Sequence, residues 1–136
     1  MALTGDRDTP HRSQLLRQVP VAADAVIHKG AQVAINGDGL AVPFSEATGL
    51  TAIGRAESRA DNTGGSDGDE TVDVLSGTFR WNNSEGADEI TREHIGDTVY
   101  AVDDETVALT DDSGARSEAG TVYDVDARGV WVTSTT

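Results

Sequence analysis

Two short β-forming stretches flank a polar turn in Ala119-Gly120-Thr121-Val122-Tyr123-Asp124-Val125-Asp126-Ala127-Arg128-Gly129-Val130-Trp131-Val132. Valine and aromatic residues favour strands, and a tight turn with glycine favours an antiparallel return of the chain. The segment therefore predicts a hairpin that closes a sheet. We expect Trp131 and Val132 to be core or subunit-interface residues and not a ligand site.

The first part of the chain carries similar signals. Apolar residues alternate strictly in residues 31–36, which predicts a half-buried strand. Asn36-Gly37-Asp38-Gly39 is the strongest hairpin signal, with two central positions that tolerate positive φ. The return strand should lie on an edge or end at Pro43, because proline donates no backbone hydrogen bond. Residues 51–56 predict another strand, in which Gly54 indicates a bulge or a close backbone approach.

Further strands follow after residues 60–70, which we interpret as an exposed, glycine-rich loop. In one straight strand, the even-numbered Val72 and Val74 would face the side opposite to the odd-numbered Phe79 and Trp81. A bend at Ser76-Gly77 is therefore needed if all four side chains are to enter the core. Thr91 is placed to cap one short helical turn. Residues 98–102, 106–109, 120–125 and 130–133 read as strands. The sequence predicts an all-β fold, a small β-sandwich or barrel-like domain over residues 19–136, preceded by an extended N-terminal arm over residues 1–18.

The formal net charge of −14 is unevenly distributed. Residues 1–60 hold six basic and six acidic side chains, whereas residues 61–136 hold four arginines and 18 acids. Such a surface repels phosphate backbones, so we expect no nucleic-acid partner. Asp outnumbers Glu by 16 to 8 and Lys29 is the only lysine, a composition typical of proteins from salt-loving organisms, although an ordinary acidic surface is the simpler alternative.

Composition also limits the chemistry. Without cysteine the chain has no disulfide, thiolate metal site or cysteine nucleophile. We see no secretory signal and no apolar run long enough to span a bilayer, and we expect no membrane partner. His11, His28 and His94 lack metal-site spacing, and none of the acidic turns fits the twelve-residue calcium loop. We therefore expect no cofactor, metal or catalytic residue, and we interpret the acidic turns as solvated.

The arm offers the sharpest candidate for a binding site, with a disordered tail as the alternative. Arg7, Arg12 and Arg17 recur every five residues, while Leu15, Leu16 and Val19 are suited to an apolar groove on a partner. Molar salt screens exposed ion pairs, so we expect the apolar residues to matter more than the arginines.

The order of the glycine turns and strands resembles that of the capsid cement, or head decoration, proteins of tailed viruses. The resemblance covers roughly residues 19–133, and it rests on these pieces in order: Lys29-Gly30, Gly37-Asp38-Gly39 with Val42-Pro43, Ile53-Gly54-Arg55-Ala56 with Asp61-Asn62, Ser76-Gly77-Thr78-Phe79, residues 95–100, residues 103–107 and residues 119–132. The charge and the arginine-bearing arm depart from typical relatives, so arm contacts do not carry over.

The resemblance implies a β-rich body, usually a homotrimer, on the outer surface of the virion capsid. There it would bind the major capsid protein, tie neighbouring copies together and stabilise the head, without enzyme activity. The composition adds the expectation of a halophilic host. The alternative is a glycan- or protein-binding β module of a cell-surface or tail adhesin. A hydrolase is disfavoured, because no nucleophile and base can be paired from the sequence.

Overall fold

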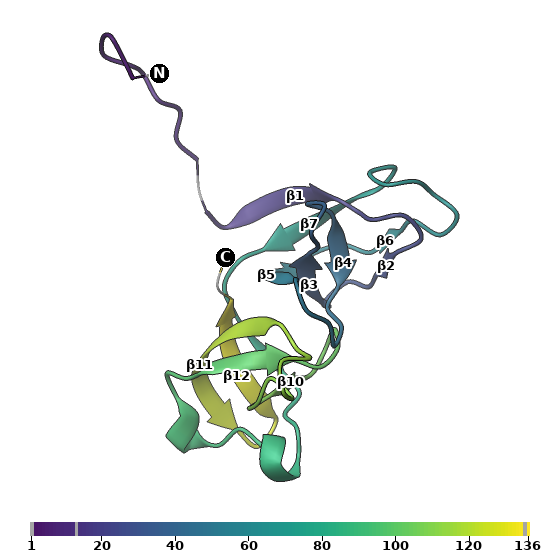
Figure 1. Ribbon diagram of the computed structural model, residues 1–136, viewed down its shortest axis with the longest axis vertical. Coiled ribbons are helices and arrows are strands. Elements are labelled where there is room, and N and C mark those ends of the chain that lie inside the picture. The colour runs from purple at the N-terminus through teal and green to yellow at the C-terminus, as the bar shows by residue number, and fades with distance from the viewer. Residues whose placement is uncertain (1, 13, 135) are drawn as a thin grey trace.

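The computed structural model describes residues 2–12, 14–134 and 136. The described chain is all-β, as predicted, and forms a small β-sandwich whose two principal sheets each have five strands (Figure 1). The first sheet has the strand order β1-β7-β5-β3-β4, the second has β10-β9-β11-β12-β8, and β2 pairs with β6 in a short ribbon. Every paired strand runs antiparallel to its neighbour.

The elements follow one another along the chain. They are β1 (Leu16–Pro20), β2 (Val26–Ile27), β3 (Gln32–Ile35), β4 (Ala41–Pro43), β5 (Thr51–Ala56), β6 (Ala60–Asp61), β7 (Thr71–Leu75), β8 (Thr78–Trp81), the 3₁₀ turns η1 (Gly86–Asp88) and η2 (Arg92–His94), β9 (Thr98–Ala101), β10 (Val107–Ala108), β11 (Glu118–Asp126) and β12 (Gly129–Ser134). The predicted single helical turn is η2, which begins directly after Thr91.

Both principal sheets curl. A parallel bridge between Val21 and Ala41 joins the two outer strands of the first sheet, and one between Asn82 and Thr106 does the same in the second. Curling turns one face of each sheet inward and encloses side chains there. The fold is thus a sandwich of two barrel-like halves, which agrees with the predicted fold class.

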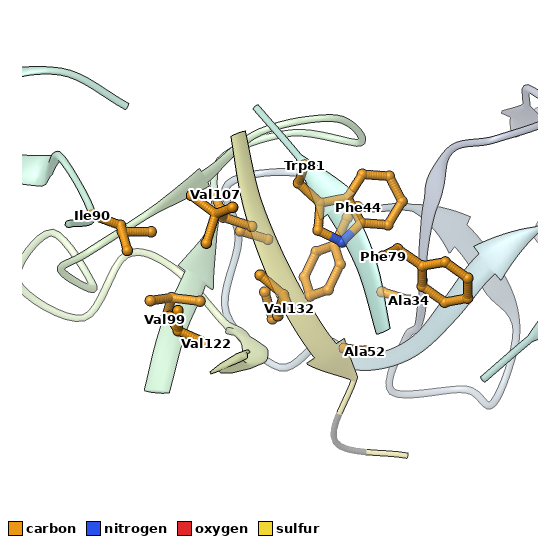
Figure 2. Close-up of a cluster of buried hydrophobic side chains, with 13 residues drawn as sticks. Ala34, Phe44, Ala52, Phe79, Trp81, Ile90, Val99, Val107, Val122 and Val132 are labelled. Atoms are coloured by element: carbon orange, nitrogen blue, oxygen red, sulfur yellow. The ribbon is translucent and has the colours of Figure 1, made fainter. Parts of the chain in front are cut away.

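The core consists of two clusters of buried side chains. The first fills the second sheet and the space between the two sheets, where Phe79 and Trp81 lie beside Ala34 and Phe44 (Figure 2). The second lies inside the first sheet under the β2–β6 ribbon, and it includes Val33, Ile53, Val72 and Val74 among its members. Since β3 and β5 contribute to both clusters, the centre of the first sheet is covered on both faces.

The bend at Ser76-Gly77 is confirmed. Strand β7 belongs to the first sheet and β8 to the second, so the chain changes sheets at these two residues. The change of direction lets Val72, Val74, Phe79 and Trp81 all enter the core despite their opposite parity.

The predicted irregularity at Gly54 is also confirmed. The register between β3 and β5 shifts there, because Val33 pairs with Gly54 while Ala34 pairs with Ala52. Gly54 has a φ of 130°, and a Cβ added to it would lie 2.1 Å from the carbonyl oxygen of Leu75. Only glycine permits this approach of β5 to the end of β7.

The hairpin between β3 and β4 lies where predicted, but its geometry differs. The backbone N–H of Gly39 donates to Asn36 O (3.0 Å), and Asn36 N–H donates to Leu40 O (2.9 Å). Positive φ occurs at Gly39 (79°) rather than at the two central positions. The Asn36 carboxamide oxygen accepts from the N–H groups of Asp38 and Leu40, which stabilises the longer turn. Strand β4 is an outer strand that ends at Pro43, as predicted.

The interpretation of residues 60–70 as an exposed loop is wrong at its start. Ala60–Asp61 form β6, and Asn62 is only 2% exposed. The side-chain amide of Asn62 donates to the carbonyl oxygens of Val21, Ala22 and Ser66. These bonds hold the β2–β6 ribbon against the residues that follow β1. Hydrogen bonds to backbone carbonyls allow the polar Asn62 side chain to be buried. From sequence alone, a polar residue of this kind is easily mistaken for an exposed loop residue.

The closing hairpin is formed by β11 and β12, as predicted. Val130 and Val132 enter the core, whereas Trp131 is partly exposed on the opposite face. The structure therefore confirms Val132 as a core residue and shows that Trp131 is not one, while its placement at a subunit interface stays a prediction.

A cluster of three charged side chains joins two loops of the second half to the loop between β4 and β5 of the first sheet. The guanidinium of Arg116, whose side chain is 10% exposed, lies 3.2 Å from Asp88 and 3.4 Å from Glu46. Burial opposes the charge of Arg116, but hydrogen bonds and attraction from the two carboxylates outweigh it, so its pKa is raised. The Thr110 hydroxyl donates to Asp88 (2.6 Å), and this bond, followed by the contact with Arg116, lowers the pKa of Asp88 against the opposing effect of burial.

Candidate functional site

A groove of about 620 Å³ lies beside the first strand, between the base of the arm and the chain's end. Its described lining consists of Arg12, Gln14, Leu15, Leu16, Arg17, Ser76, Gly77, Ser134 and Thr136. Three distant parts of the chain meet here: the start of β1, the bend between β7 and β8, and the end of β12. Figure 1 shows the arm leaving the body at this place, close to the C-terminal end.

Backbone pairing builds the walls of the groove. Strand β1 pairs with β7 in an unbroken register from Leu16 opposite Leu75 to Pro20 opposite Thr71. The N–H of Ser76 donates to Leu15 O (2.7 Å), which extends this pairing by one residue toward the arm. The Ser76 hydroxyl donates to the backbone oxygen of Thr136 (3.0 Å), so the chain's end is held against the bend.

The chemistry of the groove differs from that of the rest of the molecule. Leu15 and Leu16 are 60% and 56% exposed, and they line the groove together with Arg12 and Arg17. Among the described lining residues there is no aspartate or glutamate, although the chain as a whole carries a net charge of −14. A largely polar groove with two exposed leucines and two guanidinium groups suits a partner segment that combines apolar side chains with carboxylates.

The structure brings together four of the six residues that sequence predicted for partner binding. Arg12, Leu15, Leu16 and Arg17 line the groove, whereas Arg7 lies further out in the exposed arm. Val19 does not belong with them: it is 6% exposed, pairs with Val72 and packs in the second core cluster. Its side chain serves the fold of this chain and is not available to a partner.

The boundary of the arm also differs in the structure. Strand β1 begins at Leu16, so Leu16, Arg17 and Gln18 are paired residues of the body. Residues 2–12 and Gln14 are exposed and outside any strand. The partner of β1 lies more than fifty residues later in the chain, and no local pattern in residues 14–18 announces that pairing.

Sequence reasoning missed the other side of the groove. Ser76 and Gly77 were predicted as a bend, but nothing in the sequence indicated that this bend would lie beside the arm. Ser134 reaches the groove because its N–H donates to Gly77 O (3.0 Å). These contacts depend on the three-dimensional order of the strands, for which the sequence holds no signal.

The structure also bears on metal ligation and on membrane-spanning segments. Across the described residues, no cluster of three or more His, Asp or Glu side chains is arranged to hold a metal ion. The same part of the chain contains no helix with the length and apolar character needed to cross a membrane. His94 accepts a hydrogen bond from the N–H of Thr91 at Nδ1 (2.9 Å), which fixes the η2 turn and gives this histidine a structural role.

Three comparisons with known proteins were made for the whole chain. A scan against protein-family models, a search of curated proteins and a search of solved structures each found no match.

Proposed function

We propose that this chain is a capsid cement protein of a tailed virus, which binds the outside of an icosahedral head and ties neighbouring major capsid proteins together. The observation that carries the proposal is the join between arm and body. Residues 2–12 extend from the body (Figure 1). They lead into a groove that is lined by the exposed Leu15 and Leu16 together with Arg12 and Arg17. The ordered resemblance of residues 19–133 to the cement family supports the same conclusion.

An arm and groove of this kind suit attachment to a large surface. An extended segment contacts a partner along its whole length, although ordering each residue costs about 1–2 kcal/mol. Full burial of an exposed leucine side chain returns about 1.5–3 kcal/mol. Leu15 and Leu16 are 60% and 56% exposed, so burying what remains of both side chains offsets the ordering of about one to three residues. The body then stays outside the partner, where its acidic surface keeps it solvated.

Assembly as a homotrimer belongs to the proposal. The described fold divides its core between two clusters, and the two halves are small for independent stability. Association stabilises such a body by mass action. Light scattering in molar KCl is expected to give three times the chain mass of 14.2 kDa, and a monomer that fails to bind heads would contradict the proposal.

A halophilic setting is a separate part of the proposal and has its own test. At 1 M salt the Debye length is about 3 Å, so repulsion between exposed carboxylates is largely screened. The melting temperature is expected to rise steeply between dilute buffer and molar KCl. A melting temperature that is indifferent to KCl would instead mark an ordinary acidic surface.

The attachment test uses heads that lack the protein, incubated with purified variants and examined for occupancy. A deletion of residues 1–12 removes the exposed arm and leaves β1 intact, whereas a deletion through residue 18 would also destroy the pairing with β7. A second variant, L15S/L16S, changes the groove without shortening the chain. Both variants are expected to lose most of their occupancy.

The matched control is Tyr123→Ala. It removes another exposed large side chain, 68% exposed, from the sheet that does not contain β1, and head occupancy should be unchanged. Circular dichroism melts establish that each variant is folded. If the folded deletion and the folded L15S/L16S variant both decorate heads at full occupancy, the proposed attachment is wrong.

A further inference from the structure

The outer face of the second sheet carries a second hollow, away from the groove. It has a volume of about 430 Å³ and is lined by Thr78, Tyr123, Asp124 and Trp131. These residues come from β8, β11 and β12, which are neighbours in the sheet. Tyr123 is 68% exposed, the largest exposed fraction among the aromatic side chains of the chain.

Strand geometry explains why two aromatic rings face outward here. Val130 and Val132 enter the core, so the alternation of β12 places Trp131 on the outer face. In β11 the register shifts between Val122, which pairs with Val132, and Asp124, which pairs with Trp131. Tyr123 is the extra residue of this bulge, and bulges redirect side chains at functional positions.

The ring of Trp131 is held in place by its neighbours. Its indole N–H donates to Asp126 Oδ2 (2.9 Å), and the guanidinium carbon of Arg80 lies 5.7 Å from the ring centroid. The bond from the indole, followed by the backbone N–H of Arg128, lowers the pKa of Asp126, so this carboxylate remains a charged acceptor at neutral pH. A ring fixed before binding loses little entropy when a ligand stacks on it.

The charges around the hollow are paired. Arg92 lies 2.7 Å from Asp124, while Arg80 lies over the indole that Asp126 holds. Two cations and two anions give a locally neutral patch on a half of the molecule that is otherwise strongly acidic. The patch is therefore complementary to an uncharged ligand rather than to an anion or a cation.

We propose that this face binds a neutral oligosaccharide. The C–H faces of pyranose rings match the flat apolar faces of Trp131 and Tyr123, and the Thr78 hydroxyl and Asp124 carboxylate are placed to bond sugar hydroxyls. Aromatic side chains are also common at the centres of protein interfaces, so a second copy of this chain is the competing occupant that the experiment must distinguish from a sugar. The inference does not rest on the cementing function.

Nuclear magnetic resonance of the indole N–H groups tests this binding. The chain has two tryptophans, and Trp81 is only 7% exposed, so the Trp131 signal alone should shift when a sugar stacks. The probes are neutral hexasaccharides of glucose, mannose and N-acetylglucosamine, each titrated to roughly 10 mM, above the Kd of weak single-site ligands. Trp131→Phe assigns the signal by removing it.

Calorimetry with the hexasaccharide that gives the largest shift then measures the variants. Tyr123→Ala and Trp131→Ala are expected to weaken binding at least about tenfold, which corresponds to about 1.4 kcal/mol. Leu16→Ala is the matched control, since it removes a 56% exposed side chain from the other sheet, and it should leave sugar affinity unchanged. Leu16 belongs to the attachment groove, so the failure of one function is distinguishable from the failure of the other.

Three results would overturn the inference. The first is no shift of the Trp131 signal with any of the three hexasaccharides. The second is sugar binding that Tyr123→Ala and Trp131→Ala leave unchanged. The third is an oligomer that Tyr123→Ala converts to a monomer, which would assign this face to contacts between copies of the chain.

Discussion

The centre of the first sheet and the hairpin of the second sheet bury their strands in different ways. Strands β3 and β5 place side chains in both core clusters, so nearly every residue of Gln32–Ile35 and Ala52–Ala56 is buried. Strand β12 sends Val130 and Val132 inward and leaves Trp131 and Thr133 on the outer face. Covering on two faces produces continuous apolar runs, whereas covering on one face produces alternation.

The charges follow the same division. Residues 1–75 contain six basic and eleven acidic side chains, a net charge of −5, whereas residues 76–136 contain four basic and thirteen acidic ones, a net charge of −9. The half that contains the closing hairpin therefore carries the larger charge. Because its outer face is not covered by other strands, side chains such as Trp131 and Thr133 form a surface there.

The largest effect is expected at the centre of the first sheet. Gly54→Ala would place a Cβ against the carbonyl oxygen of Leu75 in a backbone with a φ of 130°. Backbone strain and overpacking together should cost about 3–5 kcal/mol of unfolding free energy. Urea unfolding measures the loss. Gly37→Ala is the control, since its added Cβ would meet nothing within 4 Å, and an equal loss in both variants would contradict the explanation.

Truncation of a side chain should cost more stability in a strand that is covered on both faces than on the outer face of a strand that is covered on one. Val33 is fully buried under the β2–β6 ribbon, so Val33→Ala should cost about 2 kcal/mol through lost burial and a small cavity. Tyr123→Ala removes a larger side chain from the outer face and should change stability by no more than about 0.5 kcal/mol. Equal effects in urea unfolding would mean that the outer face is covered in solution.

The ion cluster predicts a dependence of stability on pH. The pKa of Asp88 is lowered in the folded chain, so its contribution is present above the ordinary value of 3.8 and is lost as the pH falls through the folded pKa. Asp88→Asn should cost about 1–2 kcal/mol at pH 7, because Arg116 loses a charged partner. Thermal melts from pH 7 to pH 2 should show the difference from the wild type begin to shrink below pH 3.8 and disappear as the pH passes below the lower folded pKa of Asp88. A difference that grows in acid would contradict this assignment.

The smallest effect is expected at Trp131. Trp131→Phe keeps an aromatic ring and removes the N–H that donates to Asp126. Since water replaces a solvent-exposed bond of this kind, the midpoint of urea unfolding should shift little. A shift as large as that of Val33→Ala would show that the indole supports the fold rather than presenting a surface.

Much of the fold follows from local patterns in the sequence. Strand β5 has the predicted bounds, the closing hairpin lies where the valine and glycine pattern indicates, and the bend at Ser76-Gly77 follows from the parity of the buried residues. The β2–β6 ribbon was missed because its strands have two residues each. The turn at Asn36–Gly39 was placed correctly, but a side-chain hydrogen bond from Asn36 selects its geometry.

Of the residues that line the candidate groove, only those at the base of the arm could be predicted from the sequence. Exposed leucines beside arginines are visible in residues 12–17, and the structure places them along one groove. Val19 was assigned to the same set because strand residues on opposite faces look alike when the partner strand is unknown. The outward position of Tyr123 depends on a bulge, and a single extra residue in β11 leaves no mark in the sequence that distinguishes it from regular alternation.

The unbroken register of β1 with β7 determines how a pull on the N-terminus is carried. Hydrogen bonds between antiparallel strands lie perpendicular to the strands, so tension along β1 loads the pairs from Leu16–Leu75 to Pro20–Thr71 in shear and at the same time. Peeling would break them one by one, whereas shear requires them to fail together. A body attached through its N-terminal segment would therefore resist a sudden outward force until all the backbone hydrogen bonds between β1 and β7 break together.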